Sequence, residues 1–266
     1  ILFLGAATAY AFLVPLGGGI GGVDALFLVG LYVAYIYVVL QGEAGEEQHL
    51  GVPGHLQSLP RSRRVLAVAS MFAYSAFVIL IAVKPFAKGL ETLGPRLGVS
   101  SFFMIQWVAP MASESPEFVA TAYLVRKART TASFNALISS KLNQWTLLIG
   151  TLVVVYSVSL GYYDVLAFSQ KQAGEIWLTA AQSFFAVTLL FDFKMSVREA
   201  LALLGLFLAQ FYPAFQRYEG LLVFSALYVV LGLGVLLVRR RQLPRVVEAA
   251  RRHAFGTEDD PAPATD

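Results

Sequence analysis

The sequence has 266 residues, of which 57% are hydrophobic and only 14% are charged, and its formal net charge is +3. Because a soluble domain usually contains about 25% charged residues, this composition argues against a soluble protein and predicts a membrane protein. The small net charge gives no support for nucleic-acid binding, and the lack of cysteine excludes disulfides and thiolate metal sites.

Eight hydrophobic segments follow one another along the chain. They comprise residues 1–14, 23–40, 65–83, 99–125, 132–160, 175–191, 198–213 and 220–238. Apolar runs of this kind, separated by short turns or polar stretches, predict an all-α fold, a polytopic transmembrane helix bundle. The chain starts at Ile1 inside an apolar run, so we expect it to be N-terminally truncated.

The loops between these segments differ in charge. If the segments alternate across a membrane, one side receives fourteen of the 20 Lys and Arg residues and the other side receives five. The richer side holds the polar stretch 41–64, the short loops 126–131 and 192–197 with Arg198 at a helix end, and the tail 239–266. Because positively charged loops stay on the cytoplasmic side, we predict that 41–64 is a cytoplasmic loop and that the tail is cytoplasmic.

The segment 99–125 contains two carboxylates, Glu114 and Glu117, on either side of Pro116. A charge at membrane depth is costly, so acids there usually mark an ion or proton pathway. Pro116 deprives one backbone carbonyl of its helical partner and is predicted to kink or break the helix. Irregular backbone at this depth is tolerated only inside protein or around water, which predicts a buried cation site.

The next segment carries a matching polar stripe. Asn135, Ser139 and Asn143 recur at i, i+4 and i+8 and therefore share one face of a helix, as Ser113 and Glu117 do on the preceding one. Only six residues connect the two segments, so we expect antiparallel neighbours whose polar faces meet inside the bundle. Carboxylate, hydroxyl and amide oxygens are hard ligands, which suit sodium or calcium better than soft metals.

These two stretches resemble a known transporter family. Residues 112–117, Ala-Ser-Glu-Ser-Pro-Glu, are similar to the Gly-Thr-Ser-Leu-Pro-Glu signature of the sodium/calcium exchanger membrane region, in the cation/calcium exchanger superfamily of antiporters. Residues 135–143 resemble the companion motif Gly-Asn-x-x-Gly-Ser-Asn-x-x-Asn/Asp on the next helix. The resemblance implies the inverted-repeat exchanger fold, with ten core helices in two halves and cation ligands near the midplane from one alpha repeat in each half.

The resemblance also implies a division of the chain. Residues 1–40 would end the first exchanger half with two membrane segments, and residues 65–238 would form the second half plus one extra segment. The loop 41–64 and the tail 239–266 would lie in the cytoplasm. The expected partners are the lipid bilayer, cations and the missing N-terminal half of the same chain.

Carried over by position, the resemblance implies a cation site that needs no cofactor beyond the transported ions. Glu117 falls on the principal cation carboxylate, and Ser113 falls on the threonine of the motif. Ser139 and Asn143 fall on ligand or near-ligand positions of the second helix. The implied metal ligands are therefore Glu117, Ser113 and Asn143, with Ser139 close to them.

Two residues depart from the family pattern. Glu114 replaces a serine and adds a carboxylate, and Lys141 introduces a cation where the family has an apolar residue. A lysine facing two acids can occupy the place of a cation and lose its proton when a cation binds, since desolvation disfavours the charged form. We therefore assign proton or charge coupling to Lys141 and Glu114, although the two could also be a structural pair.

We predict a secondary active cation antiporter and not an enzyme. It would exchange sodium or protons against another cation by alternating access around a midplane carboxylate site. The alternatives are sodium/calcium exchange proper, or a non-transporting membrane scaffold or sensor in which Lys141 plugs the site. In the plainest alternative, Glu117 is a structural carboxylate satisfied by helix-end amides. We expect an integral protein of the cell membrane (the inner membrane where there are two).

Overall fold

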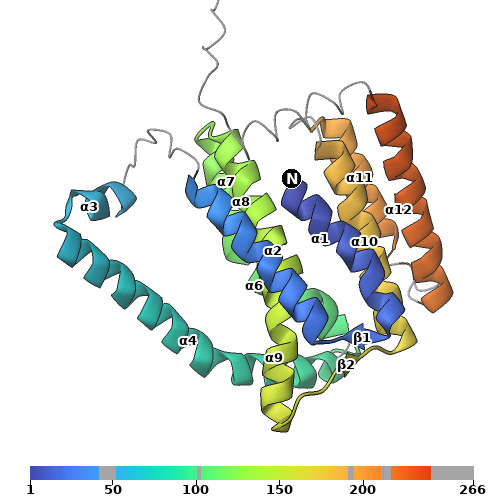
Figure 1. The fold of residues 1–266 in the computed structure, drawn as a ribbon, viewed down its shortest axis with the longest axis horizontal. Coiled ribbons are helices and arrows are strands. Elements are labelled where there is room, and N and C mark those ends of the chain that lie inside the picture. The colour runs from blue at the N-terminus through green and yellow to red at the C-terminus, as the bar shows by residue number, and fades with distance from the viewer. Residues whose placement is uncertain (42–51, 101–102, 191–194, 211, 213–216, 241–266) are drawn as a thin grey trace, which may run out of the picture. The chain divides into compact units, whose positions relative to one another are not determined.

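The computed structural model describes residues 1–41, 52–100, 103–190, 195–210, 212 and 217–240, and nearly all of these are helical (Figure 1). The chain divides into two units. Unit 1 contains residues 1–42 and 135–266, and unit 2 contains residues 43–134. Most of the predicted cytoplasmic tail lies outside the described residues, as does the first part of the predicted loop 41–64.

Unit 1 is a helix bundle with one small sheet. Its elements in chain order are α1 (Leu2–Leu13), the 3-10 turn η1 (Val14–Gly17), β1 (Gly19–Ile20), α2 (Gly22–Gln41), the π-helical turn η3 (Gln144–Leu148), α9 (Ile149–Leu160), β2 (Leu166–Ala167), α10 (Gln170–Leu189), α11 (Val197–Ala209) and α12 (Tyr218–Arg239). α10 packs against both α1 and α12, and α2 packs against α9. β1 pairs antiparallel with β2 and so joins the α1–α2 connection to the α9–α10 connection.

Unit 2 contains residues 99–125, the segment with Glu114 and Glu117, which we call the first candidate segment. Its elements are α3 (Val52–Ser58), α4 (Arg61–Arg96), the π-helical turn η2 (Met104–Val108), α6 (Ala109–Ser113) and α7 (Ser115–Arg126), and α8 (Thr130–Asn143) runs from unit 2 into unit 1. α4 is much longer than the predicted segment 65–83, because it begins inside the predicted loop and continues past Pro85. A hydropathy window ends where polar residues begin, whereas a helix continues through polar residues that are good helix formers.

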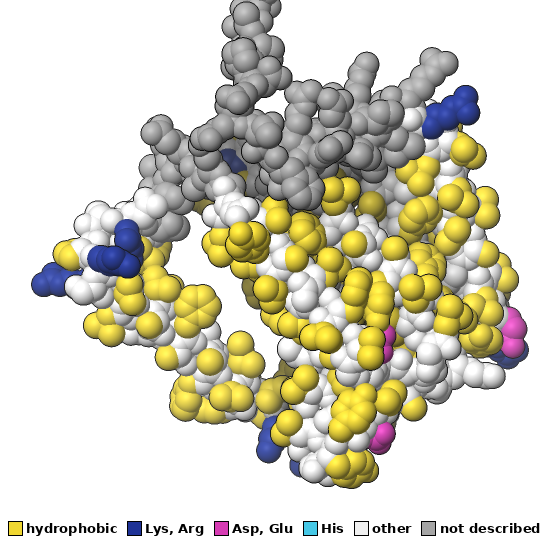
Figure 2. Space-filling view, viewed as in Figure 1, with side chains coloured by type: hydrophobic (Ala, Val, Ile, Leu, Met, Phe, Trp, Pro, Cys, Tyr) yellow, Lys and Arg dark blue, Asp and Glu magenta, His cyan; other side chains and the backbone are white. Residues whose placement is uncertain are grey.

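Each of the eight predicted hydrophobic segments contains a helix, which confirms the all-α bundle. Hydrophobic side chains cover much of the visible surface of these helices (Figure 2). Among the described residues, four helical runs are long and apolar enough to cross a membrane: Gly22–Gln41, Arg61–Arg96, Thr130–Leu160 and Tyr218–Arg239. The chain is therefore an integral membrane protein, as predicted.

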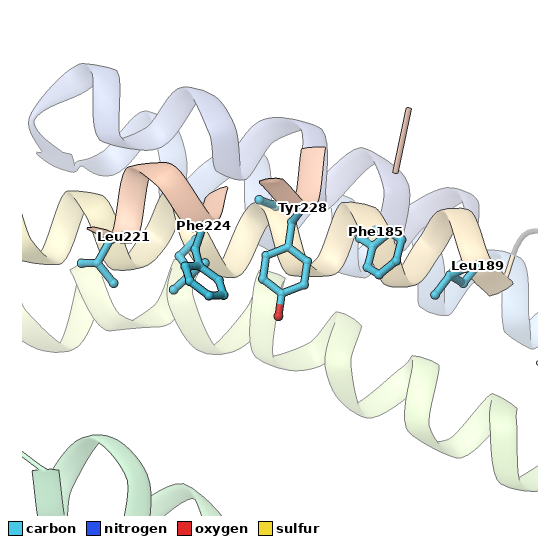
Figure 3. Close-up of a cluster of buried hydrophobic side chains, with 7 residues drawn as sticks. Phe185, Leu189, Leu221, Phe224 and Tyr228 are labelled. Carbon is cyan, nitrogen blue, oxygen red and sulfur yellow. The ribbon is translucent and has the colours of Figure 1, made fainter. Parts of the chain in front are cut away.

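α10 and α12 enclose a hydrophobic cluster (Figure 3). Its buried members are Leu178, Ala181, Phe185, Leu189, Leu221, Phe224 and Tyr228. The rings of Phe185 and Tyr228 lie 5.9 Å apart. Gly232 allows the close approach of the two helices, because a Cβ atom there would lie 2.6 Å from the ring of Phe184. α12, which contains the last predicted hydrophobic segment, is thus packed tightly on α10.

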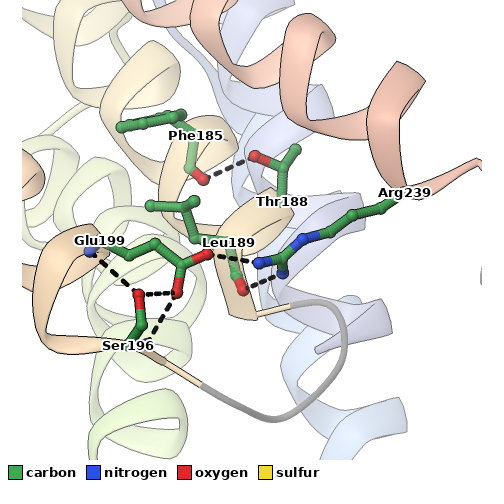
Figure 4. Close-up of polar contacts among 6 residues, drawn as sticks. All are labelled: Phe185, Thr188, Leu189, Ser196, Glu199 and Arg239. Carbon is green, nitrogen blue, oxygen red and sulfur yellow. Dashed lines mark hydrogen bonds and ion pairs between the residues drawn. The ribbon is translucent and has the colours of Figure 1, made fainter.

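Arg239, at the end of α12, binds the ends of two other helices (Figure 4). Its guanidinium donates a 2.8 Å hydrogen bond to the carbonyl of Leu189 at the end of α10 and pairs with Glu199 in the first turn of α11. Glu199 in turn forms a capping box with Ser196. A cation at a helix C-terminus and an anion at a helix N-terminus are both favourable to the helix dipoles. Arg239 therefore joins the C-terminal ends of α12 and α10 to the N-terminal end of α11.

Replacing Arg239 with methionine should lower the free energy of unfolding by roughly 1–3 kcal/mol, because charge-assisted hydrogen bonds are lost and Glu199 loses its cationic partner. A thermal-shift measurement on the purified protein should show a lower Tm. Arg240→Met is the matched control, since the neighbouring side chain is exposed. Equal losses of Tm in the two variants would contradict a stabilising role for the contacts of Arg239.

Candidate cation site

The helix of the first candidate segment breaks at Glu114, as Pro116 predicts. α6 ends at Ser113 and α7 begins at Ser115, and Glu114 between them has φ −89° and ψ −4°. Pro116 lies in the first turn of α7, where a missing N–H leaves no helical bond unmade. The carbonyl of Glu114 accepts the N–H of Glu117 at 3.0 Å and so starts the new helix.

Two serine hydroxyls at the break donate to nearby backbone carbonyls. Ser115 Oγ donates to the carbonyl of Ala112 at 2.8 Å, and Ser113 Oγ donates to the carbonyl of Pro110 at 3.2 Å. In an unbroken helix the carbonyl of Ala112 would accept the N–H that proline lacks, so Ser115 supplies the missing donor. A hydroxyl that donates in this way keeps two lone pairs, which is what a cation ligand requires.

Both carboxylates belong to the start of α7. Glu114 is the N-cap residue and Glu117 lies in the first turn, where the positive end of the helix dipole favours negative charge. The side chain of Glu114 makes no capping hydrogen bond, so helix capping does not explain its presence there. Glu117 and Ser113 are exposed, and Glu114 is half-buried. The break thus brings two negative charges and a hydroxyl to one helix end.

The second candidate segment, residues 132–160 with Ser139 and Asn143, lies in one continuous helix formed by α8, η3 and α9. Ser139 and Asn143 lie four residues apart on one face of α8, and Asn143 is exposed while Ser139 is half-buried. The π-helical turn η3 follows Asn143 directly, and η2 directly precedes α6. π-helical turns are rare and occur frequently at functional sites. Each candidate segment therefore carries such a turn, directly after Asn143 in the second segment and separated from Glu114 by α6 in the first.

Lys141 lies over the ring of Trp145, which is one turn further along the same helix. Its Nζ atom is 5.6 Å from the ring centroid. Trp145 is buried in a cluster with Leu142 and residues of α1 and α10, so its ring is a fixed surface. A cation–π contact of this kind contributes about 0.5–2 kcal/mol. The ring therefore gives the ammonium a fixed contact on its own helix, on a face about 160° from Ser139 and Asn143.

Ser139 contacts a residue that the sequence analysis did not select. Its hydroxyl forms a hydrogen bond with the hydroxyl of Tyr35 on α2. The segment 23–40 contains several tyrosines, and no motif distinguishes Tyr35 from its neighbours. The contact joins residues that are far apart in the sequence, so only the folded chain could reveal it. The cation–π partner of Lys141 and the two π-helical turns were also missed, although both are local features of the chain.

The structure brings the predicted residues together in two groups. Unit 2 holds the three residues at the helix break, and unit 1 holds Ser139, Lys141 and Asn143. Within the described part of the chain, no three His, Asp or Glu side chains gather to hold a metal ion. A cation site therefore needs hydroxyl and amide oxygens beside the carboxylates. That the two polar faces meet stays a prediction.

Two comparisons with known proteins match this chain. The sequence profile of the family described as sodium/calcium exchanger protein matches residues 67–216, which include both candidate segments. Among solved structures, the crystal structure of the H+/Ca2+ exchanger CAX is 43% identical over 94% of this chain, with a TM-score of 0.87. This chain spans 63% of the length of that protein. No curated protein matches the sequence.

Proposed function

Since this chain belongs to the sodium/calcium exchanger protein family, we propose that it acts in a secondary cation antiporter. The family and the similar solved protein are exchangers rather than enzymes, in agreement with the sequence analysis. The cation binds at the break between α6 and α7, through Glu117, Glu114 and Ser113, and Ser139 and Asn143 of α8 add further oxygens. The observation that carries this proposal is the helix break at Glu114.

The charge of this helix end suits a divalent cation. Two carboxylates neutralise a doubly charged ion, and their oxygens are the hard ligands that calcium takes. Calcium needs six to eight oxygens, about the number that carboxylates, hydroxyls, an amide and water can supply together. The similar solved protein is named for calcium and protons. We therefore take calcium as the first candidate for the cation that the sequence analysis left unspecified.

Protons are the coupling ion that we propose. Glu114 and Glu117 begin the same helix, so they repel each other once the cation leaves, and a proton on one of them relieves that repulsion. Lys141 adds a third titratable group, on α8. Sodium is the alternative coupling ion, because the family is named for sodium/calcium exchange.

A non-transporting scaffold is the second candidate function. It requires the ammonium of Lys141 to neutralise a site carboxylate permanently. The position of Lys141 over Trp145 supports transport instead, because the ring offers the ammonium a place on its own helix. Because the ammonium can contact the Trp145 ring, it does not have to stay at a site carboxylate and block cation binding.

A proton gradient should drive calcium uptake by the full-length protein in liposomes. With an acidic interior, external calcium should accumulate as protons leave, and a calcium-sensitive dye inside the vesicles records the rate. The same vesicles with an outward sodium gradient and no pH gradient are the control for the coupling ion. Uptake driven only by sodium would contradict proton coupling, and no uptake under either gradient would favour the scaffold.

A further inference from the structure

Tyr35 reaches the predicted cation ligands from a different helix. It lies on α2, and its hydroxyl forms a hydrogen bond with the hydroxyl of Ser139 on α8. The ring of Phe3 packs against the Tyr35 ring at 5.6 Å in an edge-to-face arrangement, and the ring of Tyr32 lies 6.1 Å away. Tyr35 also packs against the buried cluster that contains Trp145. The ring is thus held on several sides, which fixes the place of its hydroxyl.

A fixed hydroxyl at this place has a chemical consequence for Ser139. A serine oxygen that binds a cation must turn its lone pairs toward the cation and its proton away from it. The proton then needs an acceptor, because a half-buried polar hydrogen without a partner is costly. Either hydroxyl of the pair can donate, so the phenol oxygen of Tyr35 is available as this acceptor, and it comes from a helix that carries none of the predicted ligands.

We propose that Tyr35 is a positioning residue for the cation site. By accepting the proton of Ser139, it holds the serine oxygen in the orientation that a cation can use. The inference rests on the proposed function, since it assumes that Ser139 contributes to cation binding. It adds a residue of α2 to the determinants of cation affinity.

A merely structural role for the hydroxyl pair makes a different prediction. If the bond only joins α2 to α8, its loss lowers the Tm and leaves the cation affinity unchanged. If Tyr35 positions Ser139, its loss changes the affinity for the cation more than the maximal rate. Measuring affinity, maximal rate and Tm on the same variants separates the two roles.

Tyr35→Phe removes the hydroxyl and keeps the ring with its aromatic contacts. In calcium uptake by liposomes driven by a pH gradient, the half-saturating calcium concentration should rise about three- to tenfold, the effect of one lost hydrogen bond. The maximal rate should stay within about twofold of the wild-type rate, because the lost hydrogen bond weakens cation binding and leaves the later transport steps unchanged. Tyr32→Phe is the matched control, because it removes the hydroxyl of a neighbouring ring and should leave the half-saturating concentration unchanged.

Ser139→Ala completes a double-mutant cycle. If Tyr35 acts through Ser139, adding Tyr35→Phe to Ser139→Ala should weaken calcium binding no further. Independent, additive losses would overturn the assignment, and so would a normal half-saturating concentration in Tyr35→Phe alongside normal wild-type transport. No cation-driven uptake by the wild-type protein under any gradient would instead overturn the proposed function, and the positioning role with it.

Discussion

Replacing Glu117 with glutamine should reduce cation-driven flux to near background. Glutamine keeps the shape of the side chain and removes its charge, so a divalent cation meets one carboxylate instead of two. A cation that loses one of two carboxylate ligands should bind at least about 100-fold more weakly, which corresponds to about 2.8 kcal/mol. Initial rates of calcium uptake by the full-length variant in liposomes measure the effect.

Glu219 provides the matched control for this experiment. It is an exposed glutamate in the first turn of α12, as Glu117 is in the first turn of α7. Both substitutions remove a negative charge from the positive end of a helix dipole, so their effects on helix stability should be similar. Glu219→Gln should therefore leave transport intact. Near-normal transport in Glu117→Gln would reject Glu117 as the central ligand.

Replacing Lys141 with alanine should raise the apparent affinity for the cation and weaken the pH dependence of exchange. Without the ammonium, the two site carboxylates keep an excess negative charge that attracts cations more strongly. An increase of about tenfold in affinity corresponds to about 1.4 kcal/mol, which is modest for a charge removed near a partly buried site. Calcium uptake measured over a range of internal and external pH values tests both effects.

Lys127→Ala controls for loss of the lysine alone. Lys127 lies over the ring of Tyr123, at 5.8 Å from the centroid, in a cation–π contact similar to that of Lys141. It follows α7 in the short connection to α8, outside the predicted ligands. Its replacement should change neither affinity nor pH dependence. Unchanged affinity and pH dependence in a well-folded Lys141→Ala protein would eliminate the coupling role.

A structural role for Lys141 has its own signature. If it only compensates Glu114, its loss leaves this half-buried carboxylate without compensation, at a cost below the about 3–5 kcal/mol that is typical of a fully buried pair. Expression and Tm should then fall together. Replacing both Lys141 and Glu114 with neutral apolar residues should restore the Tm, because no buried charge is left. If the double variant recovers its Tm and the pH dependence of exchange is unchanged, Lys141 and Glu114 form a structural pair that stabilises the fold.

The helix break shows what a sequence can predict about such a site. Because a proline lacks an N–H, Pro116 predicts an interrupted helix, and the structure confirms the interruption at Glu114. The same chemistry is not decisive everywhere, since α4 continues through Pro85. The order of the apolar helices follows similarly from runs of apolar residues, whereas the short helix α3 lies in a stretch that was predicted as a loop. The lengths do not, since α4 continues to Arg96 through polar residues that a hydropathy window excludes.

The partners of the predicted ligands could not be predicted in the same way. Tyr35 and Ser139 are joined only after α2 packs near α8, and no local pattern encodes that contact. The contact of Lys141 with Trp145 follows helical spacing, yet it depends on the cluster that fixes the tryptophan ring. The π-helical turns also depend on packing, because many sequences that form them read as ordinary α-helix. Local chemistry and the family resemblance therefore predicted the ligands, whereas the contacts of these residues became visible only in the folded chain.

The most direct test of the account is reciprocal coupling between calcium and protons in one vesicle. An antiporter that uses a proton gradient to move calcium must also use a calcium gradient to move protons, because both ions share one cycle. The full-length protein is reconstituted with a pH-sensitive dye inside the vesicles and equal pH on both sides. Calcium added outside should enter and make the interior alkaline, and Glu117→Gln should abolish both changes. Calcium entry with no movement of protons would contradict the account.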